Sequence, residues 1–174
     1  MRFAVLAVVS CLVASATVRS QSAEDPELHA QLRSLFPAAE TFSPKEGSPP
    51  HFKAFGPAEG GGEPKLLGLA FWTTELEPLE RAYDGPIKIL VGMDTAGVLT
   101  GIVVADHREP YGYFSIDLPE FVRQFENKSV RDRFRVGDDI DAVSRATVTV
   151  GSASRAVRNS ARRIARAHLT PPEQ

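Results

Sequence analysis

The sequence has very little cysteine: 174 residues contain one, Cys11. A single cysteine excludes an intramolecular disulfide framework, a cysteine-ligated iron–sulfur cluster and a four-cysteine zinc site. There is also no large excess of charge of one sign, and the formal net charge of −2 gives no reason to expect a nucleic-acid partner. With 43% hydrophobic and 24% charged residues, the composition is that of an ordinary globular domain, not of a disordered, collagen-like or polytopic membrane chain.

The usual catalytic and metal-binding motifs are missing as well. The sequence has no G-x-S-x-G elbow and no G-x-x-x-x-G-K-[ST] loop. The four histidines are scattered and form neither H-E-x-x-H nor H-x-H. Asp138, Asp139 and Asp141 lack the alternating ligands of an EF-hand, so a solvated acidic turn is favoured over a calcium site. We therefore predict no metal site, and neither a hydrolase nor a metalloenzyme.

The N-terminus carries a short apolar run. Twelve of the fourteen residues in 3–16 are apolar. The run is too short for a membrane span, which needs ~20 residues, but it suits the core of a signal peptide. The small residues Ala14 and Ala16 form a cleavage motif. We predict that residues 1–20 are a signal peptide and that the mature chain is periplasmic or otherwise extracytoplasmic. The alternative is that residues 3–16 remain as a membrane anchor.

Residues 21–64 are predicted to be an N-terminal helix followed by a linker. Asp25 is a capping residue and Pro26 suits the first turn. Apolar residues then recur at i, i+4 and i+8, and the helix ends before Pro37. The remainder of the segment holds six prolines and five glycines. It is therefore predicted to be mostly loop, with a short strand at His51–Phe55.

Residues 65–170 are predicted to form the main domain. Apolar runs separated by turn signals indicate strands at Leu66–Thr74, Ile87–Met93 and Val98–Ala105. The last two are joined by a tight turn and should pair as an antiparallel hairpin. A short helix at Leu118–Phe125, a charged connector and a long helix from Val148 to His168 follow. The predicted fold class is α+β, a small, mostly antiparallel sheet packed against helices.

The long C-terminal helix has two distinct sides. Its apolar and small residues keep helical spacing, and we expect Val157, Ala161 and Ile164 to pack on the sheet. The opposite side carries a stripe of arginines: Arg155, Arg158, Arg162 and Arg166. This stripe is either a solvated helix face or a surface that docks on an acidic partner or an anionic membrane.

The segment before this helix, DAVSRATVTV at 141–150, is rich in hydroxyl side chains. Its valines and threonines would suit a strand, but the helical spacing that begins near Val150 favours a turn into the helix. A helix N-terminus presents free N–H groups and a partial positive charge, which together suit a phosphate. The alternative is that the hydroxyls simply cap the helix.

Four residues of this segment match a known motif. Asp141, Ser144, Ala146 and Thr147 resemble the flavinylation motif D-x-x-[ST]-G-A-T of FMN-binding domains, with Arg145 where glycine is usual. That family includes the C subunit of the sodium-translocating NADH:quinone oxidoreductase and the Rnf G subunit. It also includes the exported N-terminal domain of the nitrous-oxide-reductase regulatory flavoprotein. The likeness spans roughly residues 65–168 and includes His107-Arg108-Glu109-Pro110.

The resemblance implies that Thr147 carries FMN through a phosphoester bond made by a flavin transferase. It also implies that the protein is an electron-transfer module with a membrane-bound redox partner in a respiratory chain, and this is favoured over a complete enzyme. Thr149 and Ser152 are candidates to hold the phosphate charge. Asp141 is a recognition residue for the transferase or a turn cap. The alternative function is a non-redox exported binding domain that kept this fold and lost the flavin.

The flavin ring also needs contacting side chains. His107 and Glu109 are candidates to hydrogen-bond the ring edge, or else they are residues of the turn after a strand. Aromatic residues are candidates to wall the ring, although such residues in a sheet are more often core. They are Trp72, Tyr111, Tyr113 and Phe114.

Overall fold

The computed structural model describes residues 25–58, 60 and 62–169. The predicted signal peptide, residues 1–20, lies outside this part of the chain. The centre of the molecule is a five-stranded antiparallel sheet in the order β1-β2-β3-β4-β5. The strands are β1 Thr41–Phe42, β2 Phe52–Ala58, β3 Pro64–Trp72, β4 Lys88–Asp94 and β5 Leu99–Asp106. Together with the helices, this sheet confirms the predicted α+β class.

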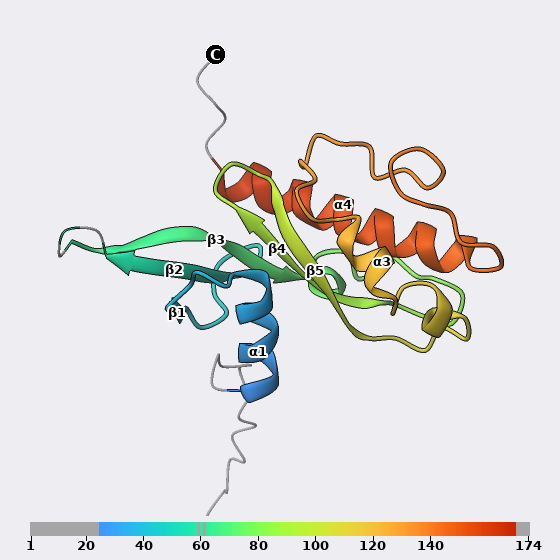
Figure 1. Cartoon of the computed structure of the whole chain (residues 1–174), viewed down its shortest axis with the longest axis horizontal. Helices are drawn as coiled ribbons and strands as arrows, with labels where there is room; N and C mark the ends of the chain where they lie inside the picture. Colours follow the sequence, from blue (N-terminus) through green and yellow to red (C-terminus); the bar gives the residue numbers. More distant parts are fainter. Residues whose placement is uncertain (1–24, 59, 61, 170–174) are drawn as a thin grey trace, which may run out of the picture.

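Helices cover both faces of the sheet. The α-helices are α1 Pro26–Leu35, α2 Thr73–Leu76, α3 Pro119–Arg123 and α4 Thr147–His168. A 3-10 turn, η2, spans Gly112–Phe114. Figure 1 shows α1 on one side of the sheet and the long α4 on the other. The charged connector, 126–141, forms loops and turns beside α4 and includes no helix or strand.

The two faces follow the alternation of side chains along each strand. In β3, Leu69 and Phe71 join the cluster beneath α4, whereas Ala70 and Trp72 join the cluster beneath α1. The α4 cluster also contains the predicted packing residues of that helix. They are Val157, Ala161 and Ile164, each fully buried. The predicted helix and its packing face are therefore confirmed, although α4 begins one residue earlier, at Thr147.

Two glycines let α1 approach the sheet closely. A Cβ on Gly68 would lie 2.7 Å from the Phe36 ring, and one on Gly92 would lie 3.0 Å from Leu35 Cβ. Neither contact leaves room for a side chain. The helix itself begins as predicted, because the Asp25 carboxylate accepts a 3.0 Å hydrogen bond from the Glu27 N–H.

Two segments differ from the prediction. The third strand of the sheet ends at Trp72, and the next four residues form α2. Thr73 turns the chain there, since its hydroxyl donates to Ile87 O and accepts from Ile89 N, each at 3.1 Å. In the linker, β2 extends to Ala58, and β1 pairs with it. These pairings are long-range, so local composition did not indicate them.

The predicted hairpin between the last two strands is confirmed. β4 and β5 pair in antiparallel register. Asp94 closes the turn, because its carboxylate accepts from the N–H groups of Ala96 and Val98 at 2.9 and 2.8 Å. Gly97 supplies a φ of 82°. Within the described residues, none of the helices combines the length and hydrophobicity that a membrane crossing needs.

Candidate functional site

The start of α4 is a tight turn that presents Thr147. The Ala146 N–H donates to Val143 O at 3.1 Å, and Arg145 adopts a left-handed φ of 69°. Ala146 is buried under the helix, whereas Thr147 is exposed. No side chain caps this helix end. The arrangement places the Thr147 hydroxyl in solvent beside the unsatisfied N–H groups of the first turn.

Arg145 occupies a backbone conformation that favours glycine. A side chain in this region costs about 1–2 kcal/mol, partly offset by the extra freedom that glycine has when unfolded. We expect Arg145→Gly to raise the free energy of unfolding by up to about 1 kcal/mol. Chemical denaturation measures this effect. Ser144→Gly, at a neighbouring exposed residue without a positive φ, is the control and should not stabilise the protein.

Thr147 lies on a groove that runs along α4. The groove encloses about 610 Å³ between one side of the helix and residues 133–136. The helix residues that line it recur at helical spacing and so share one side. They are Thr147, Gly151, Arg155, Arg158 and Arg162. Gly151 contributes no side chain one turn beyond Thr147, and the Arg155 guanidinium lies there, with Nη1 3.3 Å from the position that a Cβ would take.

Five arginines line this groove, and two of them are neutralised. Arg133 pairs with Asp138 at 2.9 Å, and Arg155 pairs with Glu80 at 2.8 Å. Arg155 belongs to the predicted arginine stripe, so this part of the stripe forms an ion pair within the protein and is not a purely solvated face.

The other three arginines have no carboxylate partner among the described residues. Arg162 donates to Val130 O and Asp132 O at 2.9 and 2.8 Å, which holds the connector against α4. Arg158 donates to Asn159 Oδ1 at 3.2 Å. Arg135 lines the groove from the connector and makes no side-chain hydrogen bond within the described part of the chain. The groove therefore carries an excess of positive charge and suits an anionic ligand.

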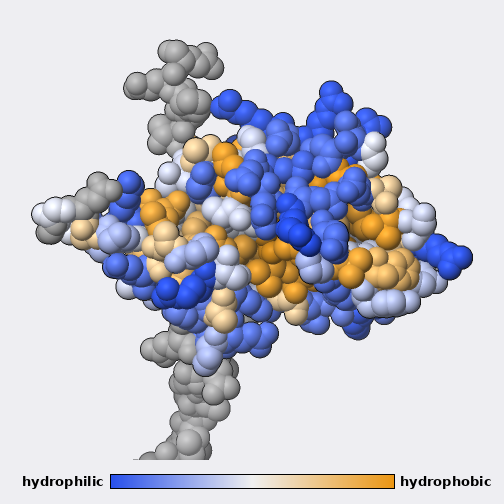
Figure 2. Space-filling view, in the orientation of Figure 1, coloured by the Kyte–Doolittle hydropathy of each residue, from blue (hydrophilic) through white to orange (hydrophobic). Residues whose placement is uncertain are grey.

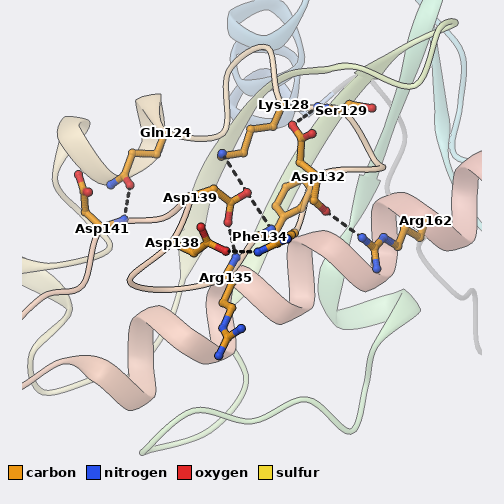
Figure 3. Close-up of polar contacts among 11 residues, drawn as sticks. Gln124, Lys128, Ser129, Asp132, Phe134, Arg135, Asp138, Asp139, Asp141 and Arg162 are labelled. Atoms are coloured by element: carbon orange, nitrogen blue, oxygen red, sulfur yellow. Dashed lines mark hydrogen bonds and ion pairs between the residues drawn. The ribbon is translucent and has the colours of Figure 1, made fainter.

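The connector wall of the groove is organised by Asp139 (Figure 3). Its carboxylate accepts from the backbone N–H groups of Phe134 and Arg135 and from the Lys128 ammonium. Burial alone would raise the pKa of Asp139, but these donors outweigh it and lower the pKa. The ionised carboxylate thus fixes the backbone from which Arg135 projects.

The structure places Thr149 and Ser152 on another side of α4, away from the groove lining. Both are buried. The Thr149 hydroxyl donates to Glu109 Oε2 at 2.6 Å, and the Ser152 hydroxyl donates to Glu80 Oε1 at 2.9 Å. These hydroxyls join α4 to neighbouring loops, and neither lies with Thr147 on the groove.

His107 and Glu109 also belong to this network of loops. The Glu109 carboxylate accepts from the N–H groups of Tyr83 and Asp84 at 3.2 and 2.7 Å. The Glu109 N–H donates to His107 Nδ1 at 3.0 Å, so the opposite ring nitrogen carries the proton and donates to Asp117 at 2.8 Å. Neither residue lines the groove.

The remaining predicted residues do not converge on one place. Trp72 is buried beneath α1, on the opposite face of the sheet from α4. Phe114 contacts the rings of Tyr111 and Tyr113, and these two are exposed. Ser144 is exposed, as is Asp141, whose backbone N–H donates to Gln124 Oε1 at 2.6 Å (Figure 3). The Asp141 carboxylate makes no hydrogen bond to the described residues, so it is not a turn cap.

A second groove of about 640 Å³ lies along β5 between α1 and α3. Its lining is apolar in large part, and Figure 2 shows apolar surface in the middle of this face of the molecule. It includes none of the residues predicted to hold a cofactor. The groove at Thr147, although slightly smaller, combines a predicted attachment residue with charge, and it is the candidate site.

Comparison with known proteins finds a similar domain. Residues 82–162 match the family model of the FMN-binding domain. This part of the chain is therefore similar to FMN-binding domains. The match includes Thr147 and all nine residues of the groove. The predicted resemblance is thus confirmed, and it implies FMN as the cofactor.

A curated relative agrees with this result. The G subunit of the ion-translocating oxidoreductase complex of Vibrio vulnificus (strain YJ016) is 31% identical over 88 residues. The alignment covers 45% of this chain and 42% of the relative. The chain therefore spans less than half of that protein's length. Together, the two matches support the similarity to FMN-binding domains.

The groove fits an anionic cofactor attached at Thr147. An exposed hydroxyl, free N–H groups and guanidinium groups without carboxylate partners lie on one surface. The sequence singled out Thr147 and the arginines of α4, several of which line the groove, but it did not indicate that Arg133 and Arg135 line it too. The sequence shows their positive charge, but it does not show that the connector packs against α4.

Proposed function

We propose that the protein is an exported electron-transfer module that carries FMN covalently, through a phosphoester bond to Thr147. The observation that carries the proposal is the exposed Thr147 hydroxyl at the N-terminus of α4, on a groove lined by arginines. The FMN-binding domain match and the motif residues before Thr147 support it.

The residues around Thr147 are suited to a phosphodiester, which keeps one negative charge. The first N–H groups of α4 and the partial charge of the helix N-terminus would hold that charge. An exposed helix terminus contributes only about 0.3–1 kcal/mol, too little to retain a free flavin outside the cell. A covalent bond to Thr147 removes this requirement. When bound, the flavin supplies the electron chemistry, and the protein positions it.

Two partners follow from this proposal. A flavin transferase would attach the cofactor to the exposed turn at 144–147. A membrane-bound redox protein would exchange electrons with the module, as the name of the Vibrio relative, which belongs to an ion-translocating oxidoreductase complex, suggests. The exposed face of the groove would leave the cofactor accessible to such a partner.

The covalent bond is tested by denaturing the protein. Protein purified from its native host should be yellow, and the colour should stay with the polypeptide after acid precipitation and washing. A noncovalent flavin would be released into the supernatant. A colourless protein from that host would contradict the proposal and favour the non-redox binding domain.

Export is tested at the N-terminus of the mature protein. Because a signal peptide ends in small residues, native protein should begin between about Thr17 and Glu24 and be found outside the cytoplasm. Edman sequencing of the fractionated protein measures both. An intact Met1 in the cytoplasmic fraction would rule out export, and an intact Met1 in the membrane fraction would indicate an anchor.

A further inference from the structure

The groove has more positive charge than a phosphodiester requires. The tether would bring one negative charge to the N-terminus of α4. Three groove arginines, Arg135, Arg158 and Arg162, have no carboxylate partner among the described residues. Arg162 is already occupied by two backbone carbonyls. Arg158 and Arg135 therefore remain available, one from each wall of the groove.

The groove extends from Thr147 toward Arg158. Eleven residues of helix separate the two, or about 16 Å along the axis at ~1.5 Å per residue. Cα–Cβ bonds on a helix tilt toward its N-terminus, and Arg158 lines the same groove as Thr147. Gly151 contributes no side chain to the intervening surface, and the Arg155 guanidinium, which is paired with Glu80, lies beside it. A ligand anchored at Thr147 can lie along this side of the helix.

We propose that the groove between α4 and residues 133–136 binds the flavin ring, and that Arg158 and Arg135 face its N1–C2=O edge. This proposal rests on attachment at Thr147. If an external donor supplied two electrons to a bound flavin and one proton were taken up at N5, a negative charge would be left at N1. Guanidinium groups at that edge stabilise this charge and favour uptake of one proton over two.

The opposite side of α4 does not offer this chemistry. There the buried carboxylate of Glu109 lies next to the helix, bonded to the Thr149 hydroxyl. A reduced ring placed beside Tyr111 and Tyr113 would be close to negative charge, which disfavours the anionic form. The charges around α4 therefore favour the groove side of the helix as the place for an anionic flavin ring.

The proposal is tested on the flavinylated full chain, with loading verified first by mass. The variants are Arg158→Gln, Arg135→Gln and, as a conservative change, Arg158→Lys. The control is Arg166→Gln, an exposed arginine of the same helix outside the groove. Two quantities are measured: the midpoint potential against pH, and the dissociation constant of sulfite. Sulfite bonds through sulfur to N5 of the oxidised ring and leaves a negative charge at N1–C2=O.

For the unmodified sequence, the potential should change by ~30 mV per pH unit near neutral pH, the value for one proton per two electrons. Each glutamine variant should weaken sulfite binding about three- to tenfold, since a partly exposed charge pair contributes roughly 1 kcal/mol. Arg158→Lys should retain most of the affinity, and Arg166→Gln should match the parent. Equal sulfite affinities and equal potentials in all fully loaded variants would overturn the proposal while leaving attachment at Thr147 intact.

A second measurement does not depend on the transferase. Free FMN is titrated into Thr147→Ala protein with and without Arg158→Gln, and flavin fluorescence reports binding. The double variant should bind FMN about three- to tenfold more weakly than Thr147→Ala alone, and Thr147→Ala/Arg166→Gln should not. Equal affinities in the three proteins would overturn the groove as the flavin site. Failure of Thr147 to become modified would instead contradict the proposed function.

Discussion

Replacing Thr147 with alanine is expected to abolish covalent flavin attachment and leave the fold intact. Parent protein coexpressed with a flavin transferase should gain the mass of one FMN less one water, and Thr147→Ala should gain nothing. The hydroxyl is exposed and caps no helix N–H, so its loss should change the free energy of unfolding by less than about 0.5 kcal/mol. Intact-protein mass and thermal unfolding measure the two effects.

Two matched variants distinguish loss of the hydroxyl that accepts FMN from disruption of the structure around it. Thr147→Ser retains an oxygen at the same backbone position and should retain some attachment. Thr149→Ala removes the other threonine of the first helical turn, which is buried against Glu109, and should keep the full mass gain even if the free energy of unfolding falls by about 1.5–3 kcal/mol. Covalent flavin on Thr147→Ala, or its loss in Thr149→Ala protein that still folds, would show that the acceptor lies elsewhere.

Replacing Glu109 with alanine is expected to destabilise the protein strongly. Glu109 is 6% exposed, and its carboxylate accepts from two backbone N–H groups and from the Thr149 hydroxyl. Removing it leaves three donors without a partner, and hydrogen bonds to charged groups are individually worth about 1.5–3 kcal/mol. We expect a loss of about 3 kcal/mol, less than the full sum because water can replace some contacts. The melting temperature should fall by roughly 6–12 °C.

The control for this effect is an exposed glutamate. Glu120 pairs with Arg123 at 3.2 Å on the surface of α3, and its replacement with alanine should cost less than about 1 kcal/mol. Because Glu109 does not line the groove, flavin attachment to folded Glu109→Ala protein should persist at low temperature. A melting temperature equal to that of Glu120→Ala would contradict the bridging role of Glu109 between residues 83–84 and α4.

The parts of the fold that the sequence predicted well are those with a strong local pattern. Asp25 and Pro26 mark the start of α1, Asp94 and Gly97 mark the hairpin turn, and the helical spacing after Val150 marks α4. Each signal acts within a few residues. β1 and the extension of β2 depend instead on pairing with distant strands. No local pattern reports such pairing.

The candidate site shows the same division. Thr147 was predicted because the motif is contiguous in sequence. Thr149 and Ser152 were expected beside it, but a helix separates neighbouring residues by about 100° of rotation, and both hydroxyls are directed toward Glu109 and Glu80 instead. The groove wall depends on Asp139 and Arg162 holding the connector against α4. These long-range contacts emerge only from the folded chain.

The most direct test of the central claim is fragmentation of one tryptic peptide. Trypsin cleaves after Arg145 and Arg155, which releases residues 146–155 with four hydroxyl side chains: Thr147, Thr149, Ser152 and Ser154. Tandem mass spectrometry of this peptide from flavinylated protein locates the modification. The account predicts one FMN less one water on Thr147. An unmodified peptide in protein made with an active transferase, or the added mass on any of the other three hydroxyls, would contradict it.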